Sequence, residues 1–85
     1  CVSLTPEQSC EAICSEMAQC QLTISGSSLA AGASCTGDCL AKIEAQGAAC
    51  KSAAAYLGDC FQTYTCDGDG VGCSDQAGSF GSDCR

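Results

Sequence analysis

An all-α fold is predicted for this chain: a small disulfide-rich three-helix bundle with an irregular, disulfide-pinned C-terminal tail, in a single domain over residues 1–85. Three observations predict it. Eleven cysteines occur in 85 residues, three segments place apolar and cysteine side chains at helical spacing, and the last twenty residues are rich in Gly and Asp. A cysteine content above about 8–10% in a short chain is typical of a disulfide scaffold.

The hydrophobic side chains are too few and too small to stabilise a domain by themselves. Hydrophobic residues make up 46% of the chain, but thirteen of them are Ala and eleven are Cys, which leaves fifteen larger ones and no Trp. A domain of this size buries only about 60% of its unfolded surface. A disulfide that closes ~15–40 residues adds on the order of 3–4 kcal/mol. We therefore expect disulfides to supply most of the stability.

Cysteine use and charge predict the compartment and exclude two kinds of partner. Disulfides persist in oxidising compartments, so we expect a secreted, extracellular protein. The net charge is −7, from ten acidic and three basic residues, and such a surface repels nucleic acid and anionic lipid. The sequence also has no apolar run long enough to span a bilayer. We expect no nucleic-acid partner and no membrane insertion.

The first helix is expected from about residue 6 to 21. Thr5 is a good N-cap, Pro6 suits the first helical position, and Gln8 stands three residues after Thr5, as a capping box requires. At about 100° per residue, an arc of about 120° forms one apolar face of this helix. The side chains on that face are Cys10, Ile13, Cys14, Met17 and Cys20.

Two further helices are expected at 36–46 and 48–65, after a loop at 22–35. Ser34 or Thr36 can begin the first of them, and Gly47 separates the two. The helical phase nevertheless continues through Gly47, so one continuous helix of about 30 residues is the alternative. It would be about 45 Å long, and much of it would lack a packing partner. We therefore favour two helices, followed by an irregular tail at 66–85.

All eleven cysteines are predicted to be structural, with their pairing open. The C-x3-C pairs Cys10/Cys14 and Cys35/Cys39 each project from one helix face, so two antiparallel helices can be joined by two bridges. Zinc sites usually show C-x2-C spacing or His, and the sequence has neither. The predicted structural cysteines are Cys1, Cys10, Cys14, Cys20, Cys35, Cys39, Cys50, Cys60, Cys66, Cys73 and Cys84.

Because eleven is an odd number, one cysteine is unpaired, intermolecular or modified. Cys1 is the natural candidate because it is terminal, and a lipid on Cys1, as in bacterial lipoproteins, would leave ten cysteines for five bridges. In the alternative, Cys1 is bridged and a different cysteine is unpaired. The chain opens on Cys1 without an initiator Met, as we expect of a processed product.

No residue pattern predicts catalysis, a cofactor or a metal. The chain has no His to act as a base and no motif that presents a nucleophile, so we expect it not to be an enzyme. The run from Asp67 to Asp75 resembles a calcium loop of the EF-hand type. However, Val71 stands at the fifth position and Gly78 replaces the bidentate Glu at the twelfth. A Gly/Asp turn explains the run equally well.

The distribution of cysteines resembles that of the mating pheromones of ciliates of the genus Euplotes. The features in common are a Cys-rich first helix (Cys10–Cys20), cysteines in the helices that follow (Cys35–Cys60) and a bridged tail (Cys66–Cys84). The resemblance implies a disulfide-stabilised three-helix bundle that diffuses as a signal, binds a cell-surface receptor and associates with itself. A weaker resemblance is to small secreted Cys-rich bacterial lipoproteins, which also carry C-x3-C helical repeats.

We therefore predict a secreted extracellular signalling protein, similar to a mating pheromone, that binds a cell-surface receptor protein through its exposed faces. The acidic side chains Glu11, Glu16 and Glu44 are the predicted receptor-facing residues. The alternative is a structural or lipid-anchored cell-surface protein, or a subunit that is cross-linked through the odd cysteine.

Overall fold

Four α-helices make up the described part of the chain. The structure is a computed structural model, and it describes residues 4–21, 29–30, 32–63 and 73–84. The helices are α1 (Pro6–Cys20), α2 (Cys35–Gln46), α3 (Ala48–Thr63) and α4 (Ser74–Asp83). The prediction of a small, disulfide-rich, all-helical fold is confirmed, with one helix more than the three expected.

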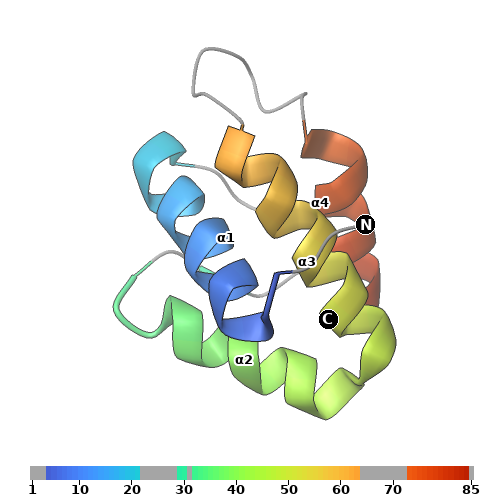
Figure 1. Cartoon of the computed structure of the whole chain (residues 1–85). Helices are drawn as coiled ribbons and strands as arrows, with labels where there is room; N and C mark the ends of the chain where they lie inside the picture. Colours follow the sequence, from blue (N-terminus) through green and yellow to red (C-terminus); the bar gives the residue numbers. More distant parts are fainter. Residues whose placement is uncertain (1–3, 22–28, 31, 64–72, 85) are drawn as a thin grey trace.

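The central helix is α3, which packs against each of the other three (Figure 1). In Figure 1, α1 and α3 lie beside each other and run in the same general direction, whereas α2 crosses below them. Helix α4 lies on the other side of α3 and runs antiparallel to it. The fold is therefore built around α3, and α1 and α4 flank it.

Helix α1 begins with the capping box that the sequence predicts. The Gln8 backbone N–H donates to Thr5 Oγ1 at 3.1 Å, and the Thr5 backbone N–H donates to Gln8 Oε1 at 3.0 Å. These two bonds satisfy backbone donors that the first turn of a helix leaves without partners. The helix ends where Gln21 adopts a left-handed conformation with φ of 53°.

The predicted apolar face of α1 is the face that enters the core. Cys10, Ile13, Cys14 and Met17 are all buried, and Cys20, at the end of the helix, is half-buried. Helical periodicity thus predicted which side chains of α1 pack inward.

The break between α2 and α3 falls at Gly47, as predicted, and the alternative of one continuous helix is wrong. Gly47 has φ of 85° and ψ of −154°, a conformation that suits glycine because it has no Cβ. The Gly47 N–H donates to the Ile43 carbonyl oxygen, and the Lys51 N–H donates to the Gly47 carbonyl oxygen. A single residue therefore ends one helix and begins the next.

The sequence prediction of an irregular tail is wrong for residues 74–83, which form α4. Glycine costs a helix about 1 kcal/mol relative to Ala, and α4 contains Gly78 and Gly81. Tertiary burial offsets this cost, because Phe80 is fully buried and so are Cys73 and Cys84 at the two ends of the helix. Residues 66–72 of the predicted tail, residues 64–65 of the predicted third helix and most of the predicted loop at 22–35 lie outside the described residues.

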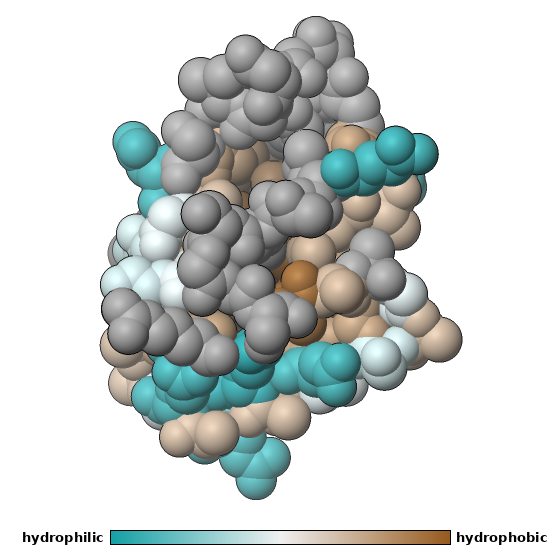
Figure 2. Space-filling model, turned by 180° about the vertical axis from the view of Figure 1, so that it is seen from behind, coloured by the Kyte–Doolittle hydropathy of each residue, from teal (hydrophilic) through white to brown (hydrophobic). Residues whose placement is uncertain are grey.

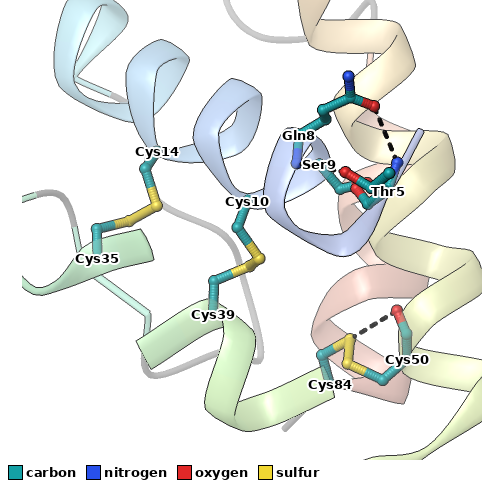
Figure 3. Close-up of a disulfide and its surroundings, with 9 residues drawn as sticks. All are labelled: Thr5, Gln8, Ser9, Cys10, Cys14, Cys35, Cys39, Cys50 and Cys84. Atoms are coloured by element: carbon teal, nitrogen blue, oxygen red, sulfur yellow. Dashed lines mark hydrogen bonds between the residues drawn. A yellow bond between two sulfur atoms is a disulfide. The ribbon is translucent and has the colours of Figure 1, made fainter. Parts of the chain in front are cut away.

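Two disulfides join α1 to α2 in the antiparallel arrangement that the paired C-x3-C spacing allows (Figure 3). Cys10 pairs with Cys39, and Cys14 pairs with Cys35, with Cα–Cα distances of 5.7 and 5.9 Å. The order along α2 is reversed relative to α1, as antiparallel helices require. These bridges hold α2 across the beginning of α1.

Two more disulfides fasten α4 to α3, one at each end. Cys60 pairs with Cys73 and Cys50 pairs with Cys84. Figure 3 also marks the approach of Cys84 Sγ to the Cys50 carbonyl oxygen, at 3.2 Å. Because a cystine sulfur carries no proton, this approach is a sulfur–oxygen contact rather than a donated hydrogen bond.

Candidate functional site

The outward face of α1 is acidic because the helical period that turns its cysteines inward turns its carboxylates outward. Glu11 and Ser15 are exposed, and Glu16 is half-buried. Gln19 Nε2 donates to Ser15 Oγ at 3.3 Å across one turn of this face. The bridges Cys10–Cys39 and Cys14–Cys35 fix the inward side of the same helix, so its outward face has a defined position.

A groove of about 360 Å³ runs along this face where α1 meets α3. Its wall from α1 is polar, and α3 contributes an aromatic ring and an amide. The ring of Phe61 belongs to the core and is only 5% exposed, so it forms an apolar base rather than a projecting contact. The lining residues are Gln8, Glu11, Ala12, Ser15, Glu16, Phe61 and Gln62.

Of the described residues that line this α1/α3 groove, two carry carboxylates and none is basic. The whole chain carries a net charge of −7, so the field around the groove is negative as well. Such a groove attracts cationic groups and repels anionic ones. Its amide and hydroxyl groups add hydrogen-bond donors and acceptors, so it is suited to binding a basic, polar surface.

Glu16 is held near the end of α1 by a neighbouring cystine. Glu16 Oε2 lies 3.2 Å from Cys20 Sγ, one turn further along the helix. Cys20 is disulfide-bonded and therefore has no proton to donate, so this is a packing contact between a carboxylate and a sulfur. The contact restricts where the Glu16 carboxylate lies at the edge of the groove.

The structure brings together two of the three predicted receptor-facing residues. Glu11 and Glu16 line one groove, whereas Glu44 is exposed on α2 and is not part of that lining. The sequence prediction did not include Phe61 and Gln62, the residues of α3 that complete the groove. Their contribution depends on which side of α3 meets α1, and a single sequence does not specify that packing.

All nine described cysteines are disulfide-bonded. Eight of them pair with one another as given above, and Cys20 is the ninth. Cys1 and Cys66 lie outside the described residues, and so does the prediction that Cys1 is the odd cysteine. The calcium-like run also lies mostly outside the described residues.

Exposed hydrophobic surface is scarce on the described part of the molecule. Tyr56 is the only large hydrophobic side chain of the described residues that is exposed. On the face shown in Figure 2, strongly hydrophobic colour is confined to one small area, and hydrophilic side chains gather along the lower edge. None of the described helices is long and apolar enough to cross a bilayer.

Comparison of the chain with known protein families, with curated proteins and with solved structures finds no match.

Proposed function

We propose that this protein is a secreted extracellular signal, similar in kind to a mating pheromone, and that it binds a cell-surface receptor through the α1/α3 groove. The observation that carries the proposal is the placement of Glu11 and Glu16 in one groove on a cystine-bridged helix. The receptor surface that it fits is basic, because the described lining of the groove includes two carboxylates and no basic group.

The cystine scaffold supports this proposal because it suits a protein that acts outside the cell. Two disulfides join α1 to α2, and two more fasten α4 to α3. Such bridges persist in oxidising surroundings and limit unfolding of a domain with a small core. The bridges from Cys10 and Cys14 also restrain the α1 wall of the groove, and such restraint lowers the entropic cost of binding.

Binding to intact cells of the source organism tests the proposal. Fluorescently labelled protein is expected to bind saturably, and unlabelled protein is expected to compete with it. Glu11→Gln and Glu16→Gln are each expected to weaken this binding by about three- to tenfold, because each removes a carboxylate from the contact. Added salt is expected to weaken it further, since exposed charges are screened.

Glu44→Gln is the matched control, because it removes one negative charge from an exposed helix position outside the groove. It is expected to leave affinity nearly unchanged. Equal weakening by all three substitutions would show a response to net charge alone and would contradict the proposed contact. An acyl mass on the purified protein, or a dimer mass that collapses on reduction, would instead favour the anchored or cross-linked structural protein.

A further inference from the structure

A second groove, of about 410 Å³, lies on the other side of α3, where α3 packs against α4. Its lining includes three residues of α3 and three of α4: Ala49, Ala53 and Tyr56, and Asp75, Ser79 and Asp83. At about 100° per residue, Tyr56 points about 140° away from Phe61 and about 120° away from Gln62 around α3. The α3/α4 groove is therefore a separate surface from the α1/α3 groove.

This groove exists because the two helices meet through small side chains and are held at both ends. Ala49 and Ala53 leave space on α3, and Ser79 leaves space on α4. The bridges Cys50–Cys84 and Cys60–Cys73 fix the helices at opposite ends of their contact. A groove between helices fixed in this way is preformed, which favours binding.

Tyr56 gives the groove a feature that core packing does not explain. Its side chain is 55% exposed although it lies next to the groove, and every other large hydrophobic side chain among the described residues is at least partly covered. Exposed tyrosines are enriched at protein interfaces, because the ring supplies contact area at a low cost in conformational entropy. A tyrosine ring also attracts a cation placed over its face.

The charge of the α3/α4 groove favours a cationic ligand. Among the described residues that line it, Asp75 and Asp83 supply carboxylates and none is a Lys or Arg. An arginine side chain complements both the exposed tyrosine ring and the carboxylates. Its guanidinium can stack on an aromatic ring and donate to a carboxylate at the same time. We propose that the α3/α4 groove binds an arginine-bearing segment of a partner protein, with the guanidinium placed between Tyr56 and Asp75.

This proposal does not depend on the receptor contact at the α1/α3 groove. It concerns a different face of α3, and it is tested on purified protein without cells. The two proposals can therefore fail separately.

The test uses a short fluorescent peptide with two arginines separated by glycine, and an otherwise identical peptide in which citrulline replaces each arginine. Citrulline keeps the shape of the arginine side chain but removes the charge. Amide chemical shifts measured by NMR are expected to move at Tyr56, Asp75 and Ser79 with the arginine peptide and not with the citrulline peptide. Tyr56→Ala and Asp75→Asn are each expected to weaken binding by about fivefold or more, and Tyr56→Phe to keep it within about twofold.

Glu44→Gln serves as the charge-matched control and is expected to leave peptide affinity unchanged. Equal binding of the two peptides, or shifts spread evenly over all acidic surfaces, would overturn the proposal. Unchanged affinity in Tyr56→Ala would overturn it as well. A concentration-dependent dimer that Tyr56→Ala abolishes would assign the groove to a second copy of this chain and would also overturn it.

Discussion

Gly58 of α3 lies directly against the backbone of Ser9 of α1. A Cβ placed on Gly58 would come within 3.0 Å of Ser9 Cα and 3.2 Å of the Ser9 carbonyl oxygen. Ser9 is itself buried, and its hydroxyl donates to the Thr5 carbonyl oxygen at 2.8 Å. This close approach sets the spacing of α1 and α3, and hence the width of the groove between them.

Gly58→Ala is expected to destabilise the protein. Alanine favours a helix over glycine by about 1 kcal/mol, but forcing a methyl group into a filled space costs about 1–3 kcal/mol. The second effect prevails here, because the atoms that the methyl group meets on Ser9 belong to backbone. We expect a net loss of up to about 2 kcal/mol in the free energy of unfolding, measured by guanidinium denaturation with the disulfides intact.

Gly78→Ala is the control for that substitution. Gly78 also lies inside a helix, but a Cβ at this position would meet no atom within 4 Å. Only the higher helix propensity of alanine then acts, so we expect the free energy of unfolding to rise by about 0.5–1 kcal/mol. If the two variants changed stability by the same amount, the close contact with Ser9 would have no energetic importance.

Thr5→Ala tests the N-terminal cap of α1. The substitution removes the side-chain acceptor of the Gln8 N–H, so it is expected to lower the free energy of unfolding by about 1 kcal/mol. Thr5→Ser keeps the hydroxyl and is expected to be nearly neutral. Thermal unfolding followed by circular dichroism distinguishes them, and equal midpoints for the two variants would argue against the cap.

Removal of the Cys50–Cys84 bridge is expected to loosen α4 while leaving α1 and α2 in place. The bridge spans 34 residues of sequence, and closing a loop of that length contributes about 4 kcal/mol in the chain-entropy view. In the double variant Cys50→Ala/Cys84→Ala, hydrogen exchange is expected to accelerate at the amides near Phe80. Cys14→Ala/Cys35→Ala is the contrasting variant, because it cuts the connection between α1 and α2 and should spare α4. Faster exchange of α4 amides in both variants would contradict this assignment.

Phe80→Ala is expected to lower the free energy of unfolding by about 3–5 kcal/mol. Phe80 is fully buried and is the only large apolar side chain of α4. Loss of helical circular dichroism together with the lower stability would show that α4 depends on this side chain. Tyr56→Ala removes an aromatic ring of similar size from an exposed position and should change stability by no more than about 0.5 kcal/mol. A loss below about 1 kcal/mol for Phe80→Ala would contradict the anchoring role.

The parts of the fold that local chemistry determines could be predicted from the sequence. Thr5 and Gln8 specify the start of α1 through bonds between residues three apart. Gly47 specifies the break between α2 and α3 through its own backbone conformation. The pairing of Cys10 and Cys14 with two cysteines of α2 follows from equal spacing on two helices, but spacing alone left the choice of partner open.

The fourth helix and both grooves depend on long-range packing. The Gly and Asp content of residues 66–85 predicted irregular structure, yet Cys73, Ala77, Phe80 and Cys84 lie within about 60° of one another at helical spacing. That stripe was the signal for α4, and two bridges to α3 make the helix stable. Glu11 could be recognised as exposed from the sequence. That Glu11 and Phe61 line one groove could not be predicted from the sequence, because the side of α3 that faces α1 depends on the close contact at Gly58.

Photo-cross-linking on intact cells tests most directly whether the α1/α3 groove meets a receptor. A photoreactive benzoylphenylalanine replaces Gln62, an exposed lining residue of that groove, and in a second variant it replaces Glu44, which lies outside the groove. Irradiation is expected to join the Gln62 variant to a membrane protein of the source organism, and excess native protein is expected to prevent the reaction. Absence of a cross-linked product, or the same product from both variants without competition, would contradict receptor binding through this groove.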